Sequence, residues 1–339
     1  MSKVIKSQTI IMNKWKTFEK TLVSICCITY NHEKFIRDAL DGFLMQQTDF
    51  SFEVLINDDA STDKTADIIR EYEAEYPGII KPIYQIENRY SQGIKPMFKY
   101  NIPRAEGRYI ALCEGDDYWT DPLKLQKQVN FLEKNDDYVI CCHGAEKIKN
   151  DIKNGYWFKP PEEKDYYMLE DYIAYGRSFM PTASLVVRNY KDKFHEWIYN
   201  SPAGDMAFIM STCLQNNGKI KRFNECMSVH REHDGGVYSS KNYLDQQVFS
   251  IETRIYLRQM LPAKYEKYFK MGIQNVLQQI IANRDNLLKK NNELKVSLKH
   301  KDELIKHKDE LIKHVYNSYT YKLGNFFLFP VKKLKSKLG

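Results

Sequence analysis

Strand-length apolar runs alternate with helical patterns between residues 22 and 86 of this 339-residue chain. Three runs have the length and the β-branched content of buried strands: 22–29, 52–57 and 79–86. Between them, apolar residues recur every three or four positions over 33–44 and 68–76, as on the buried face of a helix. We expect Ser61, Thr62 and Asp63 to form the N-cap and first turn of the second helix. This order predicts a parallel sheet with helices on its faces.

A further apolar run, Tyr109–Cys113, leads directly into the acidic residues Glu114, Asp116 and Asp117. Carboxylates at the end of a central strand repel one another unless a cation lies between them, and hard divalent cations prefer oxygen ligands. A carboxylate-held Mg²⁺ or Mn²⁺ in turn binds a diphosphate. The cluster therefore predicts an enzyme that handles a nucleotide-diphosphate substrate. The alternative for this cluster alone is an acidic turn after an edge strand.

Polar residues also follow the first two predicted strands. Asn31 comes just after the first strand, and Asp58 and Asp59 come at the end of the second. In a parallel sheet, ligands bind outside the carboxyl ends of the strands. These residues and the acidic cluster all fall at predicted carboxyl ends, so we expect them to share one ligand site.

Three segments, in this order, resemble the motifs of the family 2 glycosyltransferases of GT-A fold. They are Val23–Asn31, Asp58–Asp63 and Glu114–Asp117, with Trp119 and Pro122 after the last. The resemblance covers roughly residues 22–240. It implies the α/β class: a Rossmann-like mixed sheet with flanking helices. It also implies transfer of a sugar from a nucleotide-sugar donor, usually a UDP-sugar, with inversion at the anomeric carbon, and a type of enzyme that builds bacterial surface glycans.

The same resemblance implies roles for the residues at the ends of the first two strands. Thr29 and Asn31 would line the nucleotide pocket. Asp58 or Asp59 would accept a hydrogen bond from the uracil ring or the ribose.

The resemblance further implies how the metal and the diphosphate are held. Asp116 and Asp117 match the acidic motif that holds Mg²⁺ or Mn²⁺ on the diphosphate, with Asp117 as the main ligand. Glu114 stands where many members have Asp, so its contact with the donor is expected to differ. An Arg-x-His pattern matches at Arg231 and His233, which would bind the diphosphate and the metal; a neutral imidazole ligates divalent metals and a guanidinium fits phosphate oxygens. The alternative is an ordinary polar surface loop.

An inverting transfer needs a general base on the acceptor hydroxyl, opposite the leaving diphosphate. The family places an Asp or Glu for this role at a helix start in its second half, and the segment Ala203–Phe208 matches. We therefore expect Asp205 to be the catalytic base. The alternative is that Asp205 only caps the helix, because an acid near a helix N-terminus is favourable in any case.

Composition indicates an intracellular enzyme with a full-sized core plus an appendage, since 43% of the residues are hydrophobic and 13% aromatic. The seven cysteines form no Cys-x-x-Cys pair, so neither a zinc site nor a disulfide framework is signalled. No signal peptide is expected, and no apolar stretch approaches the roughly 20 residues that span a bilayer.

The composition changes beyond residue 245. We expect an N-terminal extension, 1–21, a GT-A domain, 22–245, a helical extension, 246–292, a short heptad-repeat helix, 293–315, and an amphipathic tail, 316–339. We expect a helix boundary near Pro262, because proline has no backbone N–H and interrupts a helix. The literal repeat of 299–305 in 306–312 has a seven-residue period, as coiled coils do, but its second seam position is Lys301 or Lys308. Oligomerisation through it is therefore an open alternative.

The last segment, 316–339, combines lysines with aromatic and aliphatic residues and has no acid. This pattern is typical of an interfacial membrane segment, and the net charge of +7 agrees with it. We expect a cytoplasmic protein that associates peripherally with the inner face of the cell membrane. The alternative is a helix docked on the protein's own surface. No nucleic-acid motif is present.

The sequence thus predicts an inverting, metal-dependent glycosyltransferase whose partners are a nucleotide-sugar donor, a glycan or lipid-linked acceptor and the membrane surface, with a second copy of the chain as an open alternative. One alternative is a sugar-phosphate nucleotidyltransferase, although the glycine-rich N-terminal loop of that chemistry is missing. Another is a catalytically silent scaffold that binds nucleotide sugars at the membrane. The acidic cluster and Asp205 argue against the scaffold.

Overall fold

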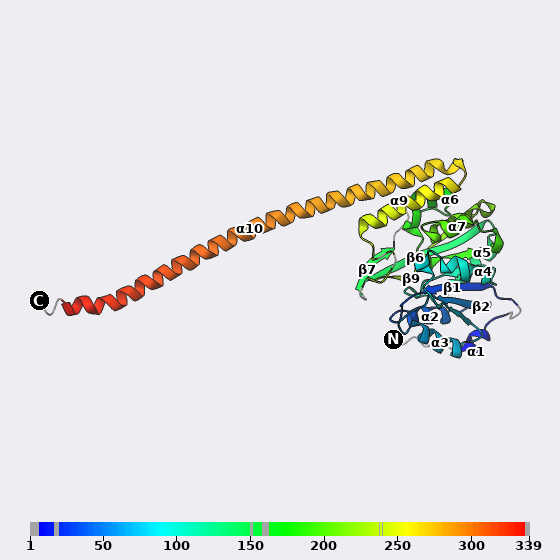
Figure 1. Cartoon of the computed structure of the whole chain (residues 1–339), viewed down its shortest axis with the longest axis horizontal. Coiled ribbons are helices and arrows are strands. Elements are labelled where there is room, and N and C mark those ends of the chain that lie inside the picture. Colours follow the sequence, from blue (N-terminus) through cyan, green and yellow to red (C-terminus); the bar gives the residue numbers. More distant parts are fainter. Residues whose placement is uncertain are drawn as a thin grey trace. The chain divides into compact units, whose positions relative to one another are not determined.

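A mixed nine-stranded sheet lies at the centre of the fold (Figure 1), and the structure, a computed structural model, describes residues 7–16, 20–149, 152–157, 163–236, 238 and 240–335. The predicted amphipathic tail, 316–339, falls on residues whose side chains lie outside this description.

Four parallel strands make up the first half of the sheet. In sheet order they are β3 (Ile80–Tyr84), β2 (Phe52–Asp58), β1 (Val23–Thr29) and β4 (Tyr109–Leu112). The parallel order confirms the prediction for this region, although the third strand is shorter than the expected 79–86. These strands end side by side, which brings the residues after β1, β2 and β4 to one edge.

The second half of the sheet adds antiparallel pairs, so the sheet is mixed and the fold is of the α/β class, as the family resemblance implied. Its strands are β8 (Val186–Arg188), β6 (Tyr138–Lys149), β9 (Lys219–Glu232) and β5 (Tyr118–Trp119), with β7 (Ile152–Trp157) paired to β6. β8 is antiparallel to both β4 and β6, whereas β6 and β9 are parallel. Because β9 also pairs with β5, just after the acidic turn, it ends beside that turn.

Helices cover both faces of the sheet. They are α1 (Gln8–Met12), α2 (Ile36–Leu44), α3 (Thr65–Glu75), α4 (Ile102–Arg104), α5 (Lys124–Lys134), α6 (Leu169–Tyr175), α7 (Trp197–Asn200), α8 (Gly204–Leu214) and α9 (Tyr243–Met260). In β1, Ile25 and Cys27 belong to the core cluster that includes residues of α2, α3 and α5, whereas Cys26 belongs to the cluster on the opposite face, which includes residues of α6 and α8. This alternation explains why the strand sequence is apolar throughout: both faces of a covered parallel sheet are buried.

The start of α3 differs from the expectation that Ser61, Thr62 and Asp63 begin the helix. The helix begins at Thr65, and its N-cap is Lys64. The Ser61 hydroxyl instead donates to Asp58, and the Asp63 carboxylate accepts from the backbone N–H of Thr65. Short polar side chains offer such local bonds as an alternative to helix, so these residues form the turn that precedes α3.

The boundary near Pro262 is as predicted. α9 ends at Met260, and α10 (Glu266–Lys335) follows after a short 3₁₀ turn. The chain divides into two compact units within α10, and these are Met1–Leu277 and Gln278–Gly339. In the first unit, a Cβ on Gly272 of α10 would lie 2.6 Å from the Ile173 carbonyl oxygen, so only glycine permits this close packing of α10 on α6.

In the second unit, Gln278–Gly339, the described residues 278–335 form the remainder of α10. Its described side chains, up to His314, are almost all exposed. Among the described residues, no helix has a stretch apolar enough to cross a membrane.

A buried lysine lies at the start of α5. Lys124 is fully buried, and its ammonium is 4.0 Å from the centroid of the Trp119 ring. Its Nζ has no hydrogen-bond partner among the described residues. Burial lowers the pKa of Lys124 to about 7, and the nearby thiols of Cys113 and Cys141 offset only part of this effect.

We expect Lys124→Met to stabilise the protein at pH 7. The folded-state pKa lies below the ordinary lysine value, so the unfolded chain binds more protons between about pH 7 and 10.5, and the wild type gains stability as the pH rises through that interval. Lys124→Met removes this slope and raises the midpoint of thermal unfolding at pH 7 by roughly 2–4 °C. Thermal unfolding from pH 6 to 10 checks this.

Lys134→Met is the matched control, because Lys134 is exposed in the last turn of the same helix. It should leave the pH slope unchanged. Equal slopes for the wild type and Lys124→Met would contradict the assignment.

Candidate functional site

The acidic turn after β4 is held tightly against the end of β1. The Gly115 N–H donates to the Ile28 carbonyl over 2.9 Å. A Cβ on Gly115 would lie 2.8 Å from Thr29 Cβ and Oγ1, which is closer than real Cβ contacts, and only 3.1 Å from His32 Nδ1. Glycine between Glu114 and Asp116 therefore lets the carboxylates approach the residues that follow β1.

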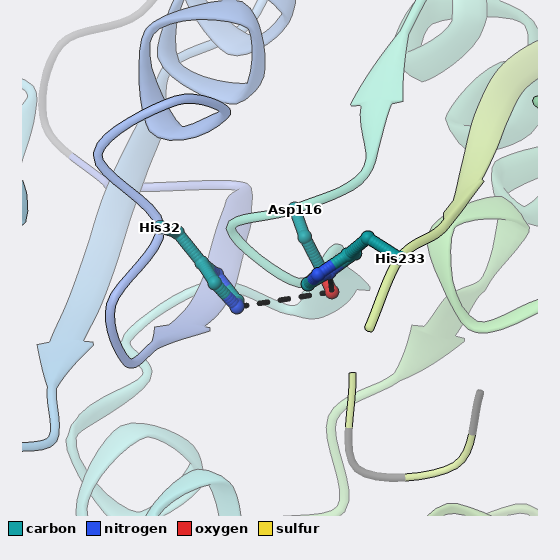
Figure 2. A group of neighbouring side chains, drawn as sticks. All are labelled: His32, Asp116 and His233. Carbon is teal, nitrogen blue, oxygen red and sulfur yellow. Dashed lines mark hydrogen bonds and ion pairs between the residues drawn. The ribbon is translucent and has the colours of Figure 1, made fainter. Parts of the chain in front are cut away.

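His32, Asp116 and His233 converge from three separate elements, as Figure 2 shows. His32 follows β1, Asp116 lies in the turn after β4, and His233 follows the end of β9. Asp116 Oδ2 is 2.9 Å from His233 Nε2 and 3.8 Å from His32 Nε2. One ligand atom from each of the three lies within 4.8 Å of the others, so the group fits a single metal ion.

Unused bonding capacity in this group agrees with a ligand. Asp116 Oδ1 and His32 Nδ1 are both buried without a hydrogen-bond partner among the described residues. Burial lowers the pKa of His32, which favours the neutral imidazole that ligates metals. Burial alone would raise the pKa of Asp116, but the hydrogen bond from His233 and the nearby histidine charges outweigh it and lower this pKa to about 2. A carboxylate with two imidazoles is a donor set that suits a divalent transition metal.

His32 was not among the site residues expected from the sequence. Its side chain follows the same strand end as Asn31, so its position after a parallel strand was the available signal. The structure adds it to the expected ligands Asp116 and His233.

Asp117 points elsewhere. Its Oδ1 accepts from the backbone N–H of Arg231 over 2.9 Å, and its Oδ2 lies 3.1 Å from His230 Nδ1. Burial would lower the pKa of His230, but the Asp117 carboxylate outweighs it and raises this pKa to about 9. Asp117 thus joins the acidic turn to β9. Its role as the main metal ligand stays a prediction, and the geometry favours Asp116.

Arg231 is also engaged with protein groups. Its Nη1 donates to the Asp116 carbonyl over 3.0 Å, and its Nη2 forms an ion pair with Asp38. The guanidinium lies 4.4 Å from the Tyr118 ring centroid and 5.2 Å from that of Phe35. Because Arg231 is buried, these contacts describe a clamp between α2, the acidic turn and β9. Its expected contact with the diphosphate is a prediction that this geometry does not support.

The residues expected to line the nucleotide pocket lie together at the ends of β1 and β2. Asn31 has a positive φ of 56°, and its Oδ1 accepts from the Thr62 N–H over 2.8 Å. Ser61 links the two strand ends, since it accepts from the Asn31 N–H and donates to Asp58. The Thr29 hydroxyl is buried without a hydrogen-bond partner among the described residues.

Asp59 holds the loop after β3. Its two carboxylate oxygens accept from the backbone N–H groups of Arg89 and Tyr90, each over 2.9 Å. The Asp58 carboxylate accepts from the hydroxyl and the backbone N–H of Ser61. The side chain of Tyr90 is half exposed beside this loop.

Glu114 and Asp205 belong to the same electrostatic neighbourhood. Burial raises the pKa of Glu114 to about 8, and the surrounding carboxylates, Asp205 among them, add to the rise. Asp205 is the second residue of α8, whose N-cap is Ala203, and that N-cap makes no side-chain cap hydrogen bond. Asp205 is therefore not the N-cap residue, and its charge reaches the acidic cluster.

We expect Asp117→Ala to destabilise the fold by about 1–3 kcal/mol, because it leaves the buried N–H of Arg231 without its acceptor. Asp234→Ala is the control: Asp234 is exposed beside the site and should change the free energy of unfolding by no more than about 0.5 kcal/mol. Urea unfolding in the presence of a chelator measures both. Equal stabilities of the two variants would overturn the bracing role of Asp117.

Known proteins resemble this chain in sequence. The model of the family described as Glycosyl transferase family 2 matches residues 24–189. A protein of Mycobacterium tuberculosis described as uncharacterized is 39% identical over 232 residues, or 67% of this chain, and the match spans 63% of that relative's length. The UDP-Glc:alpha-D-GlcNAc-diphosphoundecaprenol beta-1,3-glucosyltransferase WfaP of Escherichia coli is 33% identical over 226 residues, covering 65% of this chain and 81% of WfaP.

Solved structures share the fold. S. aureus TarS 1-349 in complex with UDP-GlcNAc superposes with a TM-score of 0.55 at 19% identity and covers 75% of this chain and 72% of that one. The mannosyltransferase PcManGT from Pyrobaculum calidifontis, in complex with GDP-Man and Mn²⁺, gives a TM-score of 0.53 at 13% identity and covers 82% of this chain and 81% of that one.

Proposed function

The chain belongs to glycosyl transferase family 2, and from this premise we propose that it transfers a sugar, with inversion, from a nucleotide-diphosphate sugar to an acceptor hydroxyl. The observation that carries the proposal is the convergence of His32, Asp116 and His233 at the carboxyl ends of the parallel strands, with the charge of Asp205 in the same neighbourhood. A nucleotide diphosphate needs a cation at this edge of the sheet, and an inverting transfer needs a separate base.

The proposed donor is a UDP-sugar. Thr29, Asn31 and Asp58 lie at the adjacent ends of β1 and β2, where the base and ribose of a nucleotide fit beside the metal group. WfaP, by its name, acts on UDP-Glc, and TarS binds UDP-GlcNAc in its complex, which supports the same donor class here.

The proposed metal ligands are Asp116, His233 and His32. When bound, a divalent ion neutralises the negative charge that develops on the leaving diphosphate. The protein's own part is to hold three donor atoms at one point: Gly115 brings Asp116 to β1, and the end of β9 brings His233. The donor set of two imidazoles and one carboxylate favours Mn²⁺ over Mg²⁺, which prefers oxygen ligands. Mn²⁺ is also the ion in the PcManGT complex.

The proposed base is Asp205. Its position in the first turn of α8 stabilises the carboxylate through the helix dipole. There it would accept the proton of the acceptor hydroxyl as that oxygen attacks the anomeric carbon, and the nucleotide diphosphate leaves on the opposite face.

The proposed acceptor is a glycan or a lipid-linked glycan of cell-surface polysaccharide synthesis. WfaP, by its name, acts on a diphosphoundecaprenol-linked sugar, and this supports a lipid-linked acceptor. We place the transferase domain at 22–245 and the helical extension at 246–292. Peripheral membrane association through 316–339 is part of the same proposal and rests on the sequence of that tail.

The first experiment tests donors. Release of nucleotide diphosphate from a panel of UDP-, GDP- and dTDP-sugars is measured with lipid-linked acceptors, in Mn²⁺ or in a chelator. We expect turnover of one UDP-sugar that the chelator abolishes. Binding of a donor without turnover under all these conditions would favour a catalytically silent nucleotide-sugar-binding protein instead.

We expect Asp205→Asn to lower the transfer rate by about 10²- to 10⁴-fold, because the amide cannot accept the acceptor's proton. Donor affinity, measured by calorimetry, should stay unchanged. Asp67→Asn is the matched control, since Asp67 is also an acid in the first turn of a helix but is exposed on α3. Wild-type rates in Asp205→Asn would rule out its role as the base.

We expect the donor-free protein to bind Mn²⁺ more tightly than Mg²⁺, and His32→Gln to weaken Mn²⁺ binding by more than about tenfold. Electron paramagnetic resonance of free Mn²⁺ measures this without turnover. His195→Gln is the control, because His195 is partly buried against Ser211 of α8 and is not among the three convergent ligands. Unchanged Mn²⁺ affinity in His32→Gln would remove His32 from the site.

A further inference from the structure

The part of α10 beyond Leu277 carries an exposed apolar stripe. Leu294, Leu298 and Ile305 are 62%, 60% and 57% exposed, and no other described segment covers them. Most of the stability of a helix in a protein comes from packing of its apolar face, so a long helix with an uncovered stripe lacks its main source of stability.

The stripe follows a heptad register that extends well beyond the literal repeat. Positions a and d of this register, taken from Leu277 to Ile312, are Leu277, Ile280, Arg284, Leu287, Asn291, Leu294, Leu298, Lys301, Ile305, Lys308 and Ile312. The seam therefore runs over about five heptads, or roughly 50 Å of helix. That length exceeds the three to four heptads that indicate a coiled coil.

The polar residues within the seam select the kind of partner. Asn291 occupies an a position, where a single asparagine specifies register in two-stranded parallel coils by pairing with its own copy. Lys301 and Lys308 occupy d positions, and each is followed at position e by an acid, Asp302 or Asp309. In a parallel pair, the e position of one chain lies beside the d position of the other, so each lysine meets a carboxylate.

We propose that α10 pairs with the same helix of a second copy of this chain, as a parallel two-stranded coiled coil over Leu277–Ile312. A bilayer surface fits the stripe poorly, because Arg284, Lys301 and Lys308 would lie within its apolar face. An identical helix in register places each polar layer opposite a polar layer and each apolar layer opposite an apolar layer. The proposal is independent of the transferase activity.

The test is the mass of the full-length protein in solution, by light scattering and sedimentation at micromolar concentration. We expect a dimer for the wild type and a monomer for the double variant Leu298→Asp/Ile305→Asp. The helix signal in circular dichroism should fall in that variant, because an unpaired helix loses the packing of its apolar face, from which most helical stability comes. Its catalytic unit should retain donor turnover, which separates loss of pairing from loss of folding.

Val296→Asp is the matched control. Val296 is 71% exposed but occupies position f, on the side of the helix away from the seam, so this variant should remain a dimer. Asn291→Leu should shift the mass above that of a dimer or raise the stability of the pair. A monomeric wild type, or a dimer that Leu298→Asp/Ile305→Asp leaves intact, would overturn the proposal. A monomeric wild type that binds vesicles through the stripe would overturn it in the same way.

Discussion

The close contact between the turn after β4 and the end of β1 is the constraint on which the site depends. Gly115 permits it, because a Cβ at this position would lie 2.8 Å from Thr29. The turn is then fixed on its other side by Asp117, which accepts from the Arg231 backbone. With the turn held on both sides, Asp116 has a defined place between two histidines. A loose turn would leave these donor atoms too far apart to share an ion.

The acidic residues in this turn divide the work according to their surroundings. Asp117 is satisfied by two donors from β9 and so stabilises the fold. Asp116 keeps an oxygen without a partner among the described residues and is held ionised. Burial and the neighbouring carboxylates raise the pKa of Glu114 to about 8. Carboxylates this close together repel one another when they are all charged, and their different environments reduce that repulsion.

The parallel half of the fold was readable from the sequence because its strands are buried on both faces and its helices carry clear periodicity. The edge at which polar residues gather followed from the same pattern. The contacts within the site could not be predicted from the sequence, because they depend on the direction in which each carboxylate points. Asp117 and Asp116 are adjacent and chemically identical, and only the position of β9 shows that Asp117 bonds to the Arg231 backbone whereas Asp116 lies beside His32 and His233. His32 was overlooked for a similar reason: a histidine in a turn gives no signal until its distant neighbours are known.

The two units of the chain differ in how their apolar side chains are covered. In the first unit, Met1–Leu277, the apolar faces of the sheet and of the helices cover one another, and Phe269 near the start of α10 takes part in this core. Beyond Leu277 the same helix continues, but its apolar residues recur every three or four positions with no described surface to cover them. A helix that stayed isolated in solvent would be more soluble with polar residues on every face, so such an apolar stripe would give it no advantage. The stripe, and the asparagine within it, are therefore best explained by a helical partner with the same spacing.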